Sequence, residues 1–140
     1  RRWLCSFIGS KSRGTQLSRE LRAELSRQCE KGSPHMCRQV TCIEGGGGSY
    51  IGAIDCTKRP DQVTSLFLKS TFCLQPPGDS WTRKSLFDSL VSGCIPVLFS
   101  PLSAYDQYKW HLPQNPNIYS LMFDASEVTH GHVDTGANCE

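Results

Sequence analysis

Residues 70–97 constrain the fold of this chain more than any other segment, because two apolar runs flank a helical pattern. The runs at 71–74 and 95–99 are short and are typical of buried strands. Between them, a loop that contains Gly78 leads into a stretch at 80–92 with helical periodicity. A strand, a loop, a helix and a second strand in this order predict two parallel strands joined by a helical crossover.

The same alternation continues along the rest of the 140-residue chain. Further strands are expected at 3–9, 39–44 and 118–123, and further helices from Thr15 or Ser18 to about Cys29, from Pro60 over Val63, Leu66 and Phe67, and over 103–110. Short strands that alternate with helices predict an α/β fold, a Rossmann-like and mainly parallel sheet with flanking helices. In such sheets ligands bind beyond the carboxyl ends of the strands, where the loop at 75–79 is expected to lie.

The first expected helix has the pattern of a surface helix. Leu17, Leu21 and Leu25 recur at every fourth position and predict its buried face. The charged residues occupy mostly the other faces and are expected to be solvated; they are Arg19, Glu20, Arg22, Glu24 and Arg27.

The expected helix at 80–92 predicts a phosphate site at its N-terminus, with Asp79 or Ser80 as the N-cap. Winding at about 100° per residue places Arg83 within the buried arc of the first turn. A charged group there is costly unless it reaches a partner beyond the helix end, and a pyrophosphate on the exposed backbone N–H groups is such a partner. Gly78 lets the anion approach the main chain closely.

Asp88 extends this predicted site from a phosphate to a nucleotide. It lies two turns after Ser80 and can accept hydrogen bonds from ribose hydroxyls while Arg83 or Ser80 holds phosphate. Ordinary helix ion pairs are the alternative, with Arg83 bound to Asp79 or Asp88, or Lys84 bound to Asp88. Because helix N-termini bind anions generically, both interpretations stay open at this point.

Residues 103–113 concentrate aromatic rings and hydrogen-bonding groups. Aromatic faces beside polar side chains suit a sugar, whose faces are apolar and whose edges carry hydroxyls. The candidate sugar contacts are Tyr105, Gln107, Trp110 and His111. A packed surface turn with aromatic anchors is the alternative.

Eight cysteines are many for a chain of this length. Six of them fall into two groups, which are Cys29, Cys37, Cys42 and Cys56, then Cys73 and Cys94. No pair has the close spacing of a zinc knuckle and His35 completes no ligand set, so disulfides in an oxidising compartment are expected. A reduced cytosolic chain with buried thiols is the alternative. Cys5 and Cys139 are expected to stay unpaired.

Several other classes of function are excluded by composition. The net charge of +2 is too small for nucleic acid or an anionic membrane as a bulk partner. No apolar run approaches the ~20 residues of a membrane span, and the absence of an initiator Met suggests a fragment.

The glycines at 45–48 lack the spacing of a phosphate loop and predict a surface loop. His130 and His132 could bind a metal, but a frayed terminus is expected there.

The motifs along residues 70–99 carry a resemblance to a known family. These motifs are Phe72-Cys73-Leu74-Gln75-Pro76, Gly78-Asp79-Ser80, Thr82-Arg83-Lys84-Ser85, Phe87-Asp88-Ser89 and Gly93-Cys94-Ile95-Pro96-Val97. The segment resembles the exostosin domain of glycosyltransferase family 47. Three further parts of the chain are similar to the plant xyloglucan galactosyltransferase branch of this family. They are residues 103–113, the segment at 3–9 and the cysteines Cys29, Cys37, Cys42 and Cys56.

The resemblance covers about residues 1–128 and leaves 129–140 as a divergent tail. It implies the C-terminal, nucleotide-sugar-binding half of a GT-B fold. Such enzymes transfer galactose from UDP-galactose, with inversion, to xyloglucan or a similar wall polysaccharide. The general base is expected from the N-terminal half of the parent enzyme, so no catalytic residue is assigned in this chain, and neither a metal nor another cofactor is expected.

By position in the family, Gly78, Ser80 and Arg83 would hold the diphosphate, Thr82 would join this substrate-binding set, and Asp88 would hold the ribose. The family also implies a Cys73–Cys94 disulfide around the helix. The parent enzyme is expected in the Golgi lumen, held by a single N-terminal membrane helix. A non-catalytic carbohydrate- or protein-binding domain derived from such an enzyme is the alternative function.

Overall fold

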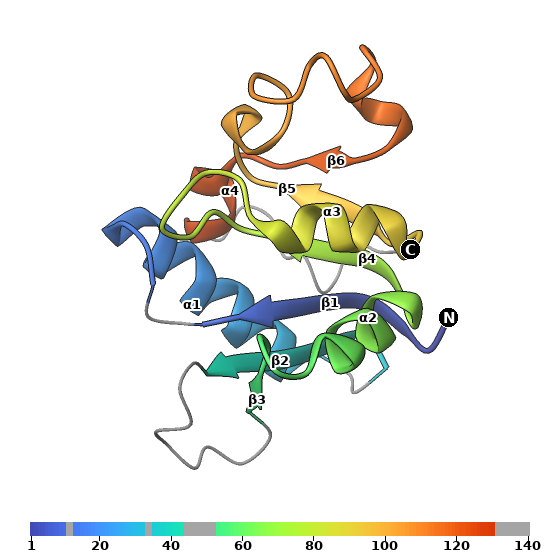
Figure 1. Ribbon diagram of the computed structural model, residues 1–140. Helices are drawn as coiled ribbons and strands as arrows, with labels where there is room; N and C mark the ends of the chain where they lie inside the picture. Colours follow the sequence, from blue (N-terminus) through green and yellow to red (C-terminus); the bar gives the residue numbers. More distant parts are fainter. Residues whose placement is uncertain (11–12, 33–34, 44–52, 131–140) are drawn as a thin grey trace.

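A six-stranded sheet with helices on both faces forms the centre of the molecule (Figure 1). The computed structural model describes residues 1–10, 13–32, 35–43 and 53–130. The strands are β1 (Trp3–Gly9), β2 (Cys37–Ile43), β3 (Ile54–Asp55), β4 (Ser70–Gln75), β5 (Ile95–Leu98) and β6 (Leu121–Met122). The helices are α1 (Gln16–Lys31), α2 (Pro60–Leu68), α3 (Lys84–Val91) and α4 (Ala125–Thr129), with short 3₁₀ turns η1 (Pro101–Ser103) and η2 (Pro116–Ile118).

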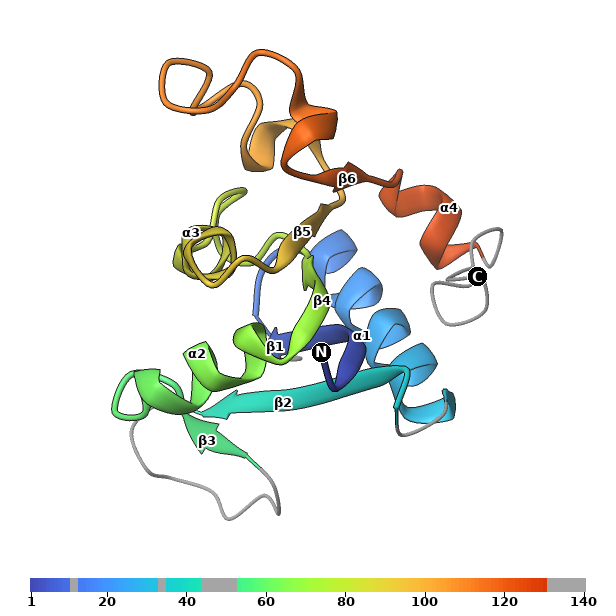
Figure 2. The same cartoon turned by 90° about the vertical axis from the view of Figure 1, so that its right-hand side faces the viewer.

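Every strand pair in this sheet is parallel, and the strand order is β3-β2-β1-β4-β5-β6. The predicted α/β fold with a Rossmann-like sheet is therefore confirmed. Helices α1 and α4 cover one face, and α2 and α3 cover the other (Figure 2). Strands β2 and β3 are added on one side of β1, and β4, β5 and β6 on its other side. Because the crossovers then run in opposite directions, the helices that follow β1 and β4 lie on opposite faces.

The core has two layers because successive strand side chains point to opposite faces. Phe7 packs beneath α1 and α4 with Leu21, Leu25 and Val128. The next residue, Ile8, packs on the other side with a cluster that includes Val63, Leu66, Phe67, Cys73 and Cys94.

Helix α1 begins where expected, because the side chain of Thr15 accepts a hydrogen bond from the Ser18 N–H at 3.3 Å. Leu21 and Leu25 are fully buried, as predicted. Leu17 is 51 % exposed, so its assignment to the buried face is wrong. It lies in the first turn of the helix, where the neighbouring Ser18 is the buried residue instead.

Helix α3 begins at Lys84 instead of residue 80 or 81, and its N-cap is Arg83 instead of Asp79 or Ser80. The preceding residues turn on themselves. The Gly78 N–H donates to the Ser80 carbonyl at 3.0 Å, and the Ser80 hydroxyl donates to the Thr82 carbonyl at 2.6 Å. These local bonds compete with the helical pattern and delay it by one turn.

The segment between β5 and β6 also differs from expectation. The helix predicted over 103–110 is replaced by η1 and a series of turns, and the strand predicted over 118–123 is shortened to β6. The reason is tertiary packing: Ala104 is buried against Leu86 and Leu98, with Tyr105 and Leu112 packed beside them.

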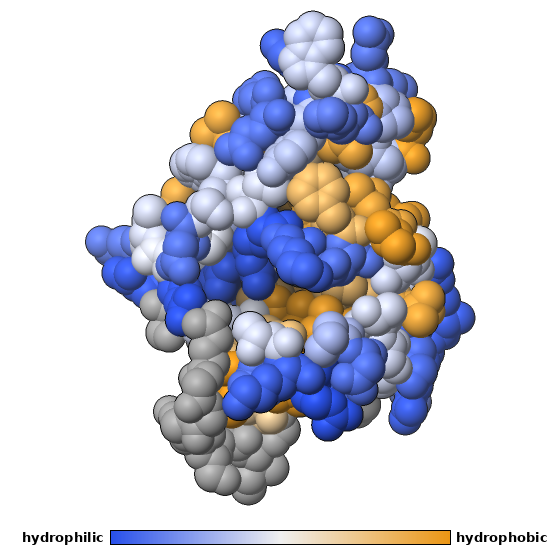
Figure 3. Space-filling view, viewed as in Figure 1, coloured by the Kyte–Doolittle hydropathy of each residue, from blue (hydrophilic) through white to orange (hydrophobic). Residues whose placement is uncertain are grey.

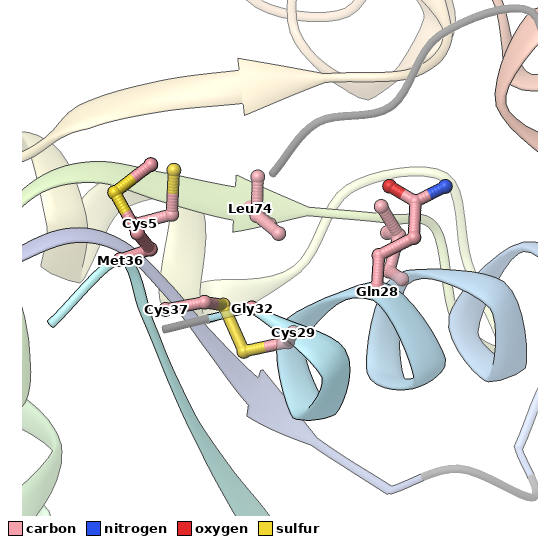
Figure 4. A pocket seen from close by; sticks show the side chains of 8 residues that line it. Cys5, Gln28, Cys29, Gly32, Met36, Cys37 and Leu74 are labelled. Atoms are coloured by element: carbon pink, nitrogen blue, oxygen red, sulfur yellow. A yellow bond between two sulfur atoms is a disulfide. The ribbon is translucent and has the colours of Figure 1, made fainter. Parts of the chain in front are cut away.

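Three disulfides join the six grouped cysteines as Cys29–Cys37, Cys42–Cys56 and Cys73–Cys94. The disulfide prediction is confirmed, including the Cys73–Cys94 pair that the family resemblance implies. Figure 4 shows the Cys29–Cys37 bridge between the end of α1 and the start of β2, beside the buried thiol of Cys5. The hollow there holds about 10 Å³, which is room for about one water molecule and no larger ligand.

Some expectations lie outside the described residues: those on Cys139, on the glycines at 45–48 and on His132. Within the described residues, no helix is both long enough and apolar enough to cross a bilayer. In the same part of the chain, no three His, Cys, Asp or Glu side chains gather as a metal-binding group.

Candidate functional site

The topology brings two loops together at the carboxyl edge of the sheet. Strands β1 and β4 are hydrogen-bonded neighbours, and the helices that follow them leave to opposite faces. Such a switch point opens a crevice between the loops that follow the two strands. Strand β1 ends at Gly9, and the loop after β4 contains Gly78.

Arg83 points into this crevice from the start of α3. Its Nη2 and Nη1 atoms lie 3.3 and 3.4 Å from the Ile8 carbonyl oxygen, to which both donate. The guanidinium rests against Gly9, where a Cβ atom would lie only 3.0 Å from Nη2. The absence of a side chain at Gly9 therefore makes room for the arginine.

Arg22 reaches the same crevice from α1, and the expectation that it is solvated is wrong. Arg22 is only 2 % exposed. Nε donates to the Pro77 carbonyl at 2.9 Å and Nη1 to the Ser10 carbonyl at 2.5 Å, so Arg22 joins the loops after β4 and β1. A Cβ atom at Gly78 would lie 2.7 Å from Nη2 of Arg22. A side chain at position 78 would therefore have to displace the Arg22 guanidinium.

A weak signal in the sequence could have identified Arg22 as a buried residue. Ser18 and Ser26 lie four residues before and after it, and both are buried. A small residue on each side along one helix stripe leaves room for a long side chain to lie against the sheet.

The two arginines form a desolvated positive cluster. Burial, followed by the positive charge of Arg22, lowers the pKa of Arg83 to about 10, and Asp79 opposes this shift. Burial also lowers the pKa of Arg22. Asp79 is exposed and pairs instead with Arg13, at 3.6 Å. Among the described residues no carboxylate lies within ion-pair distance of Arg22 or Arg83, which is an arrangement that favours a bound anion.

A cleft of about 520 Å³ opens beside Arg83, between the N-terminal halves of α2 and α3. Its floor is apolar and consists of Ile8, Val63, Pro60 and the Cys42–Cys56 disulfide. Its polar lining comes from Thr57, Thr64, Arg83, Lys84, Ser85 and Asp88. Figure 3 shows this face, with hydrophobic residues at the bottom of the hollow and hydrophilic residues along its rim.

The cleft unites only part of the predicted nucleotide-binding set. Arg83 and Asp88 line it, whereas Ser80 is exposed outside it. The Thr82 hydroxyl lies 2.6 Å from the Ser103 carbonyl and 2.8 Å from Oε1 of Gln107, so Thr82 braces the loop after β5. Lys84 and Ser85 line the cleft, although sequence reasoning assigned them no role in the nucleotide site.

The alternative of helix ion pairs is partly realised. Lys84 Nζ lies 2.6 and 2.7 Å from the two carboxylate oxygens of Asp88. Arg83 forms neither of its two possible pairs and remains available for another anion.

The predicted sugar contacts are also divided by the structure. Tyr105 and Trp110 line a second pocket, of about 380 Å³, in the segment between β5 and β6. Gln107 faces Thr82 instead, and His111 is exposed and lines neither pocket.

The fold and site together define an α/β domain with a cationic cleft at the carboxyl edge of a parallel sheet. Residues 1–133 match the Exostosin GT47 domain, and the chain belongs to this glycosyltransferase family. The family resemblance read from the motifs is therefore confirmed.

Similar curated proteins come from Arabidopsis thaliana. Xyloglucan-specific galacturonosyltransferase 1 is 48% identical over 91% of this chain and 17% of its own length. Probable xyloglucan galactosyltransferase GT15 is 43% identical over 91% of this chain and 25% of its own length. Xyloglucan galactosyltransferase XLT2 is 41% identical over 94% of this chain and 23% of its own length. The chain thus spans a quarter or less of each of these relatives.

Proposed function

We propose that this chain is the nucleotide-sugar-binding half of an inverting, GT-B-type glycosyltransferase. In this proposal the parent enzyme transfers galactose from UDP-galactose to xyloglucan or a similar polysaccharide side chain. The observation that carries the proposal is buried Arg22 beside half-buried Arg83 at the switch point of the sheet, with no carboxylate among the described residues within ion-pair distance of either. Relatives named as xyloglucan galactosyltransferases support the choice of sugar and acceptor.

Each part of a nucleoside diphosphate finds a matching surface in the cleft. The diphosphate would bind Arg83, with Lys84 released from Asp88 to a second phosphate oxygen. Asp88 would then accept hydrogen bonds from the ribose hydroxyls. The apolar floor at Ile8 and Val63 suits the faces of the base.

In the transfer itself, the residues of this chain would bind and orient the donor and stabilise the leaving diphosphate. Negative charge develops on that group as its bond to the sugar breaks, and Arg83 lies where it can stabilise this charge. The general base that deprotonates the acceptor hydroxyl would come from the N-terminal half of the parent enzyme. Because arginine supplies the positive charge, we expect UDP affinity to be unchanged by EDTA.

The compartment follows from the same proposal. Three disulfides are stable in the secretory pathway, and they support a place for the parent enzyme in the Golgi lumen. A single N-terminal membrane helix of the parent would hold it there as a type II protein.

Calorimetry with UDP and UDP-galactose tests the proposal. The chain should bind UDP, and Arg83→Ala should weaken binding about tenfold or more because a charge-assisted contact is lost. Asp88→Ala should weaken UDP more than pyrophosphate. Arg27→Ala is the matched control, since this exposed arginine pairs with Glu24 on α1, away from the cleft. A folded chain that binds no UDP contradicts the proposal.

A second function is favoured by the aromatic pocket between β5 and β6. A non-catalytic carbohydrate-binding domain derived from such an enzyme would use this pocket alone. It predicts glycan binding by a chain that has no measurable affinity for UDP.

A further inference from the structure

The pocket of about 380 Å³ between β5 and β6 is independent of the cleft beside Arg83. No residue lines both. Its walls include three aromatic side chains, Tyr105, Trp110 and Tyr119, with Leu112, Pro113 and Pro116 between them. Its volume falls in the range of small-molecule sites, about 300–1,000 Å³.

Two of the aromatic walls are fixed in place. The Tyr105 and Tyr119 rings meet edge to face, with centroids 6.2 Å apart. The Tyr105 hydroxyl lies 3.0 Å from Oγ of Ser120, which in turn donates to the Pro116 carbonyl at 3.0 Å. The segment itself is held to α3 by the contact of Tyr108 with Phe87. The walls are therefore rigid before any ligand binds.

Trp110 differs from the other two rings because it is 85 % exposed. A large apolar ring in water is unfavourable, and covering its face removes apolar surface from water. Lys109 lies on one side, with Nζ 5.8 Å from the centre of the Trp110 ring. The ring thus forms an uncovered platform at the edge of a rigid pocket.

Polar groups surround this platform. Lys109 and Gln114 lie at the pocket, and both are exposed. Burial, together with the neighbouring Tyr105, raises the pKa of Tyr119, so its hydroxyl keeps its proton and can donate a hydrogen bond. An aromatic platform with donors and acceptors around it matches a pyranose ring, which has apolar faces and hydroxyls along its edge.

We propose that Trp110, Tyr105 and Tyr119 form a stacking subsite for the glucan backbone of the acceptor, separate from the nucleotide cleft. β-Linked glucose rings carry equatorial hydroxyls, and their two faces are flat and apolar enough to lie on Trp110. Lys109 and Gln114 bond to the hydroxyls at the edge. The identity of the acceptor rests on the proposed function, whereas the subsite rests on the pocket itself.

Titration of the chain with cellohexaose and with a xyloglucan oligosaccharide tests this subsite. Trp110→Ala should weaken binding of both about tenfold, because a stacked face is lost, and Trp110→Phe should restore most of the affinity. UDP affinity should not change in either variant. Trp81→Ala is the matched control, since Trp81 is also exposed but lines neither pocket.

Each result separates the subsite from the proposed nucleotide function. A chain that binds UDP but neither glycan overturns the subsite alone. Unchanged glycan affinity in Trp110→Ala, or an equal loss in Trp81→Ala, also overturns it. Glycan binding that depends on Trp110 in a chain without UDP affinity supports the subsite and contradicts the donor-binding proposal.

Discussion

At the scale of single residues, Arg22 shows how a charge can serve the fold and the site together. It is buried on the helix that follows β1. It donates hydrogen bonds to the carbonyls of Pro77 and Ser10, which lie in two loops and are 67 positions apart in the sequence. Its two hydrogen bonds add to the surface ion pair of Arg13 with Asp79, which joins the same two loops. Its positive charge also disfavours the charged form of Arg83, and the two guanidinium groups together favour an anion between them.

Replacing Arg22 by Met should lower the free energy of unfolding by about 1–3 kcal/mol. Two carbonyl groups lose their donor, and part of this cost is offset because a buried cation is removed. Urea denaturation measures the change. Arg19→Met is the control on the same helix, because Arg19 is exposed and its replacement should change stability by no more than about 0.5 kcal/mol. Equal effects of the two substitutions would contradict the structural role of Arg22.

Glu24 on the same helix should make stability depend on acid. The hydrogen bond from Arg27 is the main cause that lowers the pKa of Glu24 from 4.5 to about 2, with a smaller contribution from Gln28. The pKa is lower in the folded state, so the stabilisation is complete above pH 4.5 and is lost as the pH falls towards 2. The stability difference between the parent chain and Glu24→Gln, followed by urea denaturation, should shrink over this range. A difference that stays constant would rule out the ion pair as its source.

At the scale of elements, α3 is held at both ends by different means. Its N-terminus carries the arginine that enters the crevice, and just beyond its C-terminus Cys94 is joined to Cys73 on β4. The loop that this disulfide closes contains the whole Gly78 turn and the helix. The bridge therefore restricts how far Arg83 can move from the sheet.

Removing this bridge with the double substitution Cys73→Ala and Cys94→Ala should lower the free energy of unfolding by about 3 kcal/mol in the chain-entropy model. UDP affinity should fall as well, because the loop that carries Arg83 becomes less ordered. The matched comparison is removal of the Cys29–Cys37 bridge, which lies at the end of α1, away from the cleft. That variant should lose stability but keep its UDP affinity. Unfolding monitored by circular dichroism and calorimetry with UDP measure the two effects.

The elements also show where sequence patterns succeed and fail. An apolar run that ends on a glycine predicted β1, the Thr15 cap and recurring leucines predicted α1, and Pro60 at the first helical position predicted α2. In these three elements the local preferences agree with the packing. The start of α3 was misplaced because hydrogen bonds of the Gly78 and Ser80 backbone and hydroxyl cannot be read from periodicity. The segment over 103–110 failed for a different reason: its burial against Leu86 and Leu98 depends on residues elsewhere in the chain.

For the whole molecule, the sequence by itself determined the parallel α/β class, the disulfide-bonded cysteines and the family. These follow from local patterns and from motifs that lie within one continuous segment. Only the tertiary structure decided that Arg22 is buried, that Arg83 forms neither expected ion pair, and that Tyr105, Trp110 and Tyr119 line a pocket apart from the cleft beside Arg83. The physical reason is that burial, loss of hydration and the meeting of loops depend on residues that are distant in sequence, and they are fixed only when the sheet brings β1, β4 and α1 together.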